Sequence, residues 1–341
     1  MSRSLTRTVS AAIIVALLAG IFFFLQNVNL PDNLIGRPPV LETRAGRPIQ
    51  SLYQLEAQAA REGWTPERAR LAGDLWREAG DLRRAVAYWE AADSVPAVLR
   101  DRAQAYVELE RWADAADALA ALLDQLPADS PDLAWAQFQL GLIRAAYDPQ
   151  SALDLLRAAE PTYGASAATL IGVLEGSSDP IQIGITLARA ELWSHAELTF
   201  SQSGDPLAVA YTGLARDIQG KDGSPQIDAA VAFAPDNPQV RYLQGLHLRQ
   251  RYDYVGSLDA MVQAVALDPE NPALYAELGR AYQLTGDMTA AERWLRFAVS
   301  LDDHFQPLLD SFYDDERTAL LNLGLVDEAA LPFDPTPTPE P

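Results

Sequence analysis

A segment near the C-terminal end of the chain repeats at an interval of 34 residues. The sequence PQVRYLQGLHLRQRYDYVGSLDAMVQAVALDP begins at Pro238, and PALYAELGRAYQLTGDMTAAERWLRFAVSLDD begins at Pro272. A fixed period of this length predicts stacked copies of one small unit, in which each copy contacts only its neighbours. Such a chain has no single central core, so its function is expected on a surface that several copies share.

The copy that begins at Pro272 has the pattern of a helix hairpin. Apolar residues at helical spacing lie on both sides of a break at Gly286 and Asp287. Small residues stand where the two helices must approach closely, and bulky residues fill the space beside them. Prolines at the starts of the copies fit this pattern, because proline suits the first turn of a helix and not its interior. The residues that carry the pattern in this copy are Leu278, Gly279, Tyr282, Ala290, Ala291, Trp294, Leu295 and Ala298.

The pattern resembles the tetratricopeptide repeat (TPR) family, in which a Leu-Gly pair, a Tyr, a Gly at the turn, an Ala, a bulky residue, an Ala and a Pro recur in this order. About seven copies can be traced over residues 66–305. They begin near residues 66, 96, 134, 177, 206, 238 and 272, and the middle copies are the least regular. The expected fold class is all-α: an α-solenoid of antiparallel helix hairpins, preceded by one N-terminal transmembrane helix.

An uncharged segment near the N-terminus predicts this membrane anchor. Residues 1–8 form a short tail with Arg3 and Arg7, and residues 9–28 include the run AAIIVALLAGIFFFL. The segment is long enough to cross a bilayer. A cleaved signal peptide is the alternative, but its apolar core would be shorter and would precede a small-x-small cleavage site. No such site follows the run, and no cysteine follows that could carry a lipid anchor.

The charges beside this segment predict its orientation. Arg3 and Arg7 lie close to one end, whereas Arg37, Arg44 and Arg47 lie farther from the other end and among acidic residues. The positive-inside rule therefore favours a cytoplasmic N-terminus. The protein is expected to be a single-pass membrane protein whose repeats lie on the extracytoplasmic side.

The segments that flank the repeats have distinct compositions. Residues 29–50 contain prolines and glycines and predict a linker. Residues 51–65 predict an N-terminal helix. Residues 306–330 predict capping helices, because a terminal repeat would otherwise expose its apolar face. Residues 331–341, rich in Pro and Thr, predict a disordered tail.

The sequence offers no catalytic constellation, cofactor motif or metal site. His195, His247 and His304 lie in different copies without the spacing of metal ligands. Lys221, the only lysine, does not follow the spacing of a phosphate-binding loop. There are no cysteines, and the net charge of −21 argues against nonspecific binding of nucleic acid. We expect neither an enzyme nor a protein with a cofactor or a small-molecule substrate.

The resemblance implies that the first helix of each pair lines a concave groove, which binds a peptide or a helix of a partner protein. Arginine recurs at the expected groove positions although the chain is acidic. These arginines either bind acidic side chains or a terminal carboxylate of a partner, or form ion pairs within the chain itself. The expected groove residues are Arg70, Asp74, Arg77, Arg100, Gln104, Tyr242, Arg249, Arg280 and Gln283.

Apolar residues occupy the corresponding positions of the middle copies. They either form a docking site for a partner helix or belong to the ordinary core. These residues are Trp135, Phe138, Leu142, Ile181 and Ile185.

Three classes of function remain. The leading interpretation is a membrane-anchored scaffold for protein–protein interactions. The alternative is an accessory or chaperone-like subunit of a membrane assembly of the secretion, pilus or cytochrome-biogenesis type. An enzyme with an unrecognised site is disfavoured, because residue types suited to catalysis do not cluster. The expected partners are other proteins and, through the anchor, the membrane.

Overall fold

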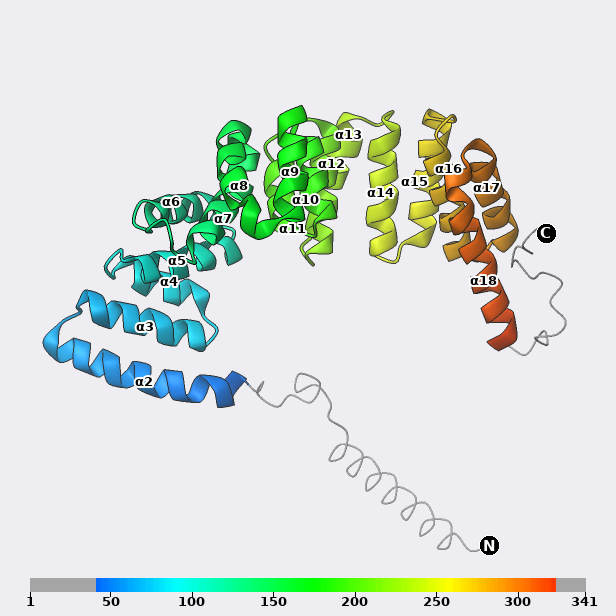
Figure 1. Ribbon diagram of the computed structural model, residues 1–341. Helices are drawn as coiled ribbons and strands as arrows, with labels where there is room; N and C mark the ends of the chain where they lie inside the picture. The colour runs from blue at the N-terminus through cyan, green and yellow to red at the C-terminus, as the bar shows by residue number, and fades with distance from the viewer. Residues whose placement is uncertain (1–40, 323–341) are drawn as a thin grey trace, which may run out of the picture. The chain divides into compact units, whose positions relative to one another are not determined.

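The computed structural model describes residues 41–322, and the side chains of residues 50–315 (Figure 1). The predicted anchor at residues 9–28, the short tail before it and the Pro/Thr tail at residues 331–341 lie outside the described residues. Over residues 41–322 the regular structure consists of helices, without a strand. No helix in this range is both long enough and apolar enough to cross a bilayer.

The chain divides after Leu126 into two compact units. Unit 1 is Met1–Leu126 and unit 2 is Pro127–Pro341. The described helices of unit 1 are α2 (Leu41–Glu62), α3 (Pro66–Glu78), α4 (Leu82–Glu90), α5 (Pro96–Glu108) and α6 (Trp112–Leu123). Those of unit 2 are α7 (Leu133–Tyr147), α8 (Pro149–Tyr163), α9 (Ala165–Gly176), α10 (Pro180–Arg189), α11 (Trp193–Phe200), α12 (Pro206–Ile218), α13 (Ser224–Phe233), α14 (Pro238–Gln250), α15 (Tyr254–Leu267), α16 (Pro272–Thr285), α17 (Met288–Leu301), the 3-10 helix η2 (Asp303–Phe305) and α18 (Gln306–Asn322).

Most of these helices pair with their neighbours in the chain as hairpins. Unit 1 contains the hairpins α3/α4 and α5/α6, and its helix α2 packs on α3. Unit 2 contains α7/α8, α10/α11, α12/α13, α14/α15 and α16/α17. Each unit is therefore a stack of helix hairpins, which is the all-α solenoid arrangement predicted from the sequence.

Proline and an oxygen-bearing cap set the starts of most first helices. Asn237 precedes Pro238, and its side-chain oxygen accepts hydrogen bonds from the backbone N–H groups of Gln239 (2.9 Å) and Val240 (3.2 Å). The cap satisfies donors that the first helical turn leaves unpaired, and proline at that position has no N–H to lose. Thr65, Asp179, Asp205 and Asn271 cap α3, α10, α12 and α16 in the same way.

A small residue in each first helix lets the second helix approach closely. A Cβ atom built on Gly184 of α10 would lie 2.4 Å from the ring of Phe200 on α11, closer than any real contact. In α5 the equivalent residue is Ala103, which is fully buried. The other glycines meet a bulky residue of their own second helix: Gly73 with Trp89, Gly141 with Leu156, Gly213 with Ile227, Gly245 with Met261 and Gly279 with Leu295.

The turns of six of these hairpins share a left-handed backbone residue, whereas Asp148 between α7 and α8 has a negative φ of −146°. Glycine, which adopts this conformation without strain, occupies the position in three hairpins as Gly80, Gly220 and Gly286. Three other hairpins use a residue with a side chain, at a cost of roughly 1–2 kcal/mol each. These residues are Glu110 (φ 56°), Glu191 (φ 60°) and Tyr252 (φ 64°).

Helix α9 is an addition that the sequence did not predict. It lies between the expected third and fourth copies and packs against the preceding helix α8 and the following helix α10. Its apolar side, formed by Ala167, Leu170, Ile171 and Leu174, joins a core cluster with residues of α7, α8, α10 and α11. The left-handed Gly164 (φ 50°) ends α8 and allows the chain to begin this extra helix. The wide spacing of the middle copies therefore reflects an inserted helix.

Helix α2 also differs from the expectation, because it begins inside the segment predicted as a linker. The sequence predicts a linker at residues 29–50 and a helix at residues 51–65, since proline and glycine disfavour helix. Helix α2 instead runs from Leu41 to Glu62 and includes Gly46 and Pro48. Leu52 and Leu55, which lie in the part of α2 that was predicted as helix, are buried against Ala72 of α3.

The last helix covers the end of unit 2. Leu309 and Phe312 of α18 are buried against Ala291 and Leu295 of α17. This contact removes from water the apolar side that the last hairpin would otherwise expose.

The close approach in α10/α11 can be tested with Gly184→Val. The added side chain overlaps the ring of Phe200, so we expect a loss of about 1–3 kcal/mol in the free energy of unfolding, measured by urea denaturation. Gly172→Ala in α9 is the matched control, because a Cβ there meets no atom within 4 Å. The control is expected to gain about 0.5–1 kcal/mol. Equal stability of Gly184→Val and the wild type would show that the helices do not depend on this contact.

Candidate functional site

The predicted groove residues of unit 1 lie on α3 and α5, and most of them bond within the unit. Arg77 forms an ion pair with Asp101 of α5, and its guanidinium lies 5.4 Å from the ring centroid of Trp89. Asp74 accepts a hydrogen bond from the indole N–H of Trp89 (3.0 Å). Gln104 donates to Glu108 of its own helix (2.8 Å). Arg70 and Arg100 are exposed on α3 and α5.

The predicted groove residues of unit 2 form one polar cluster on α14 and α16. The carboxylate of Glu277 accepts from Arg249 of α14 (2.8 Å) and from Arg280, one turn along α16 (3.3 Å). Glu277 and Arg249 are partly buried, whereas Arg280 is exposed. Gln283 lies half-buried near the end of α16. These pairs correspond to the intramolecular alternative for the arginines.

Tyr242 belongs to the same cluster. The pKa of Tyr242 is raised to about 12, mainly by burial and in addition by the nearby Glu277 carboxylate, whereas Arg249 and Arg280 act in the opposite direction. Burial also raises the pKa of Tyr211 on α12. Both hydroxyls therefore stay protonated at neutral pH and remain hydrogen-bond donors.

Half-buried apolar side chains extend from this cluster over the first helices of three hairpins. They pack against the core without being fully covered by it. These side chains are Ile185 of α10, Leu207, Tyr211 and Leu214 of α12, and Tyr242 and Leu246 of α14. We call this set, together with Arg249, Glu277 and Arg280, the first-helix surface of unit 2.

The apolar residues predicted in the middle copies divide between core and surface. Phe138 and Leu142 of α7 are buried, and Phe138 stacks on Tyr163 with ring centroids 3.9 Å apart. They are therefore core residues. Trp135, Ile181 and Ile185 are half-buried.

A hollow of about 750 Å³ adjoins Arg280 at the end of unit 2. Its lining combines the cation of Arg280 with the apolar Phe305 and Leu308 and with the polar Asp303, His304 and Ser311. The sequence placed Arg280 at the groove but gave no signal for this hollow, because η2 and α18 form its other side.

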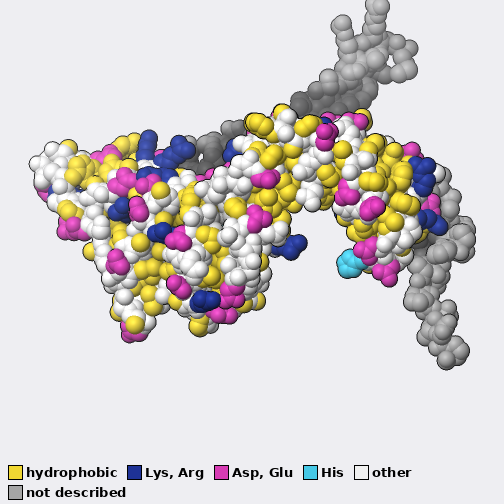
Figure 2. Space-filling model, turned by 90° about the horizontal axis from the view of Figure 1, so that it is seen from above, with side chains coloured by type: hydrophobic (Ala, Val, Ile, Leu, Met, Phe, Trp, Pro, Cys, Tyr) yellow, Lys and Arg dark blue, Asp and Glu magenta, His cyan; other side chains and the backbone are white. Residues whose placement is uncertain are grey.

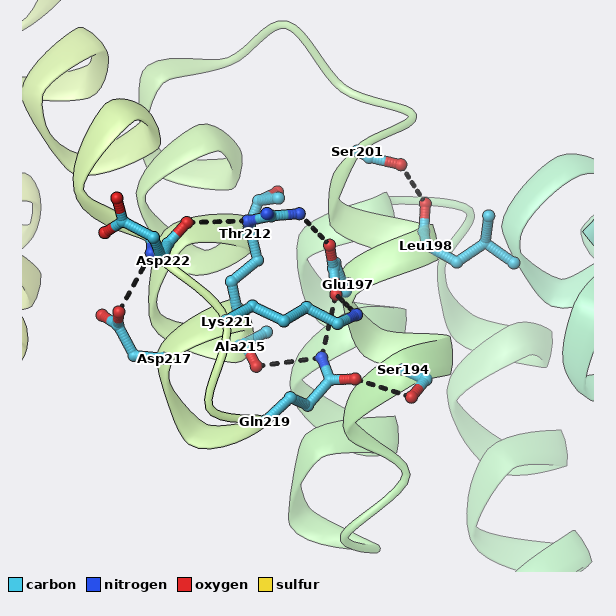
Figure 3. A network of polar contacts seen from close by, with 12 residues as sticks. Ser194, Glu197, Leu198, Ser201, Thr212, Ala215, Asp217, Gln219, Lys221 and Asp222 are labelled. Atoms are coloured by element: carbon cyan, nitrogen blue, oxygen red, sulfur yellow. Dashed lines mark hydrogen bonds and ion pairs between the residues drawn. The ribbon is translucent and has the colours of Figure 1, made fainter. Parts of the chain in front are cut away.

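A second polar cluster joins α11 to α12 and to the following turn (Figure 3). Glu197 of α11 accepts from Arg216 (2.8 Å), Gln219 (2.9 Å) and Lys221 (2.7 Å). Ser194 donates to the side-chain oxygen of Gln219 (2.7 Å). Glu197 is only 15% exposed, so two cations offset the cost of removing its charge from water. Lys221 thus takes part in a polar contact that links neighbouring hairpins.

The three histidines occupy unlike environments. His247 of α14 pairs through Nδ1 with the carboxylate of Asp217 on α12, and both side chains are almost fully buried. His304 is exposed beside the hollow. His195 of α11 is buried, and burial lowers its pKa to about 4. Over the residues that the structure describes, no three His, Asp or Glu side chains gather as metal ligands would.

Negative charge is concentrated in unit 2. Residues 127–341 contain 12 basic and 31 acidic residues, a net charge of −19 out of −21 for the chain. Figure 2 shows acidic side chains scattered among hydrophobic ones over the face it displays. Long-range attraction to this unit therefore favours basic partners, and acidic groups are attracted only where arginines gather.

Three comparisons relate the chain to known proteins. No protein-family model matches it, and no curated protein matches it. Among solved structures it is similar to MamA from Desulfovibrio magneticus RS-1, at 18% sequence identity and a TM-score of 0.26, over 62% of this chain and 97% of that chain. It is similar to a tetratricopeptide repeat protein from Parabacteroides merdae ATCC 43184, at 13% identity and a TM-score of 0.30, over 80% and 97%.

Yeast Tom70 is similar at 14% identity and a TM-score of 0.33, over 81% of this chain and 70% of that chain. TM-scores this low carry no argument about family or function.

Glu277 and Tyr211, which belong to the first-helix surface of unit 2, were not predicted from the sequence as groove residues. A signal for Glu277 existed: it precedes Arg280 by three residues, so the two share one helical face. Its second contact, with Arg249, depends on how neighbouring hairpins align and was not predictable from spacing alone.

The buried His195 predicts a loss of stability in mild acid. Between pH 6.5 and pH 4 the unfolded chain binds a proton at this residue and the folded chain does not, so stability falls as the pH falls. We expect the wild type to lose about 2 kcal/mol more than His195→Gln between pH 7 and pH 5, measured by urea unfolding at both pH values.

The matched control is His304→Gln, because His304 is exposed. Its free energy of unfolding should change between pH 7 and pH 5 by the same amount as that of the wild type. An identical pH dependence of the wild type and His195→Gln would contradict the assignment of a buried, neutral imidazole.

Proposed function

We propose that the protein is a membrane-anchored scaffold that binds a peptide or helix of a partner protein on the first-helix surface of unit 2. The observation that carries this proposal is the composition of that surface. Half-buried tyrosine and leucine side chains on α12 and α14 lie next to a cluster of two arginines and one glutamate. Aromatic side chains and arginines are the residue types that contribute most to binding at protein interfaces.

The geometry suggests the chemistry of the partner segment. An apolar side would cover Tyr242 and Leu246, which are already partly shielded from water. An acidic group of the partner would take the place of Glu277 at Arg249 and Arg280 through charge-assisted hydrogen bonds. The two arginines are paired with Glu277 before the partner arrives, so an acidic group of the partner must compete with Glu277 for them.

The membrane part of the proposal is supported by the sequence alone. The uncharged segment at residues 9–28 has the length of a transmembrane helix, and Arg3 and Arg7 precede it. The anchor would hold both units close to a membrane, on its extracytoplasmic side.

The binding surface can be tested by substituting its arginines. The double variant Arg249→Glu/Arg280→Glu reverses the charge that an acidic partner would contact. We expect at least a roughly tenfold loss of co-purifying partner from solubilised membranes, quantified by mass spectrometry against the wild type. Arg77→Glu tests the corresponding position of unit 1 separately.

The matched control for these variants is Arg296→Glu. Arg296 lies on the second helix α17 and pairs with Glu292 (2.8 Å), so its reversal alters charge and an ion pair without touching the first-helix surface. Unchanged co-purification by the double variant would exclude this surface as the binding site. Circular dichroism of each variant checks that the helices are retained.

The anchor can be tested by fractionation. The full chain is expected to stay with the membrane after an alkaline carbonate wash, and deletion of residues 1–28 should release it. Protease added to vesicles of known orientation should digest residues 41–322 only when the extracytoplasmic side faces outward. A mature N-terminus beyond residue 28, found by mass spectrometry, would replace the anchor with a cleaved signal peptide.

A further inference from the structure

The turn between α14 and α15 exposes an aromatic and aliphatic surface. Tyr252 is 80% exposed and Val255 is 75% exposed, and the ring of Tyr254 lies edge-on to that of Tyr252 with centroids 6.4 Å apart. Figure 1 shows this turn at the lower ends of α14 and α15, where the two helices join. We call Tyr252, Tyr254 and Val255 the turn patch. Exposed apolar patches of this kind mark sites of interaction with other molecules.

The backbone of Tyr252 gives a second, independent observation. Tyr252 has the left-handed conformation (φ 64°) that Gly220 and Gly286 have in the neighbouring hairpins. A bulky residue in this conformation is strained, and an exposed ring contributes little to the stability of the fold. Folding alone would therefore be served better by glycine at this position.

The neighbouring turns extend the apolar character of this edge. Ile218 precedes the α12–α13 turn, and Leu284 and Met288 flank the α16–α17 turn. All three are exposed. The ion pair of Arg251 with Asp222 (3.0 Å) joins the turn patch to the α12–α13 turn, so the two turns lie side by side.

The charge of this edge indicates what it can contact. Its cations are already paired, Arg251 with Asp222 and Lys221 with Glu197. Asp253 and Asp287 cap α15 and α17, and within the described part of the chain neither forms an ion pair. The charge left over at this edge is negative, as is the net charge of unit 2.

We propose that the turn patch docks a basic amphipathic helix of a partner protein. The apolar side of that helix would cover Tyr252 and Val255, and its Lys or Arg side chains would reach Asp253 and Asp287. An anionic lipid surface fits poorly, because the carboxylates would repel it. This surface is separate from the first-helix surface of unit 2, so one chain can hold two partners.

The test uses the full chain and a fluorescently labelled helical peptide of about 18 residues, with leucines on one side and arginines on the other. Tyr252→Gly relieves the strain of the left-handed backbone and removes the aromatic ring. It should therefore raise the Tm and yet weaken binding about tenfold in fluorescence anisotropy. Val255→Ser, which leaves the backbone of Tyr252 unchanged, should also weaken binding.

Glu191→Gly is the matched control, because Glu191 has the same left-handed conformation in the α10–α11 turn. It should raise the Tm and keep the affinity within about twofold of the wild type. The same peptide with glutamates in place of arginines should not bind.

Three results would each overturn the proposal. It fails if the arginine peptide does not bind the wild type, if Tyr252→Gly binds as tightly as the wild type, or if the glutamate peptide binds equally well. A wild type that self-associates in sedimentation, and that Tyr252→Gly makes monomeric, would place a second copy of the chain on this edge instead.

Discussion

The close approach of the two helices within each hairpin is the contact on which the rest of the structure depends. Each first helix presents a glycine or, in α5, an alanine, and the second helix places a bulky side chain directly against its backbone. Because this contact faces the inside of the hairpin, the opposite side of the first helix remains available. The first-helix surface of unit 2 is thus a product of internal packing that is repeated from hairpin to hairpin.

Arginine and lysine side chains near this surface form ion pairs with carboxylates of the chain itself. Glu197 pairs with Arg216 and Lys221, and Glu277 pairs with Arg249 and Arg280. In a chain with 47 acidic and 26 basic residues, cations are scarce and carboxylates easily surround them. A partner that binds Arg249 or Arg280 must therefore compete with a carboxylate of the chain itself, which favours partners that also bring apolar contacts.

The sequence was informative where local rules decide the structure and less so where neighbouring hairpins align. Proline with a capping Asn or Asp marks helix starts such as Pro238 and Pro272, and this signal needs no tertiary contact. Helix α9 was missed because its apolar residues match no copy of the repeat. The ion pairs of Arg77 and Arg249 join residues 24 and 28 positions apart, so they depend on the register of adjacent hairpins. The candidate residues therefore lie on the first helices of their hairpins, as predicted, whereas their ion-pair partners could not be predicted from the sequence.

Helix α9 interrupts the regular succession of hairpins along the chain. Four hairpins follow it without a further insertion, and their first helices are α10, α12, α14 and α16, although α7 still contacts α10 and α11. With helices packed about 10 Å apart, four first helices in succession span about 30 Å. That length corresponds to a helix of about 20 residues or an extended peptide of about nine. The four consecutive hairpins after α9 thus define the length of the partner segment that we expect to fit the first-helix surface of unit 2.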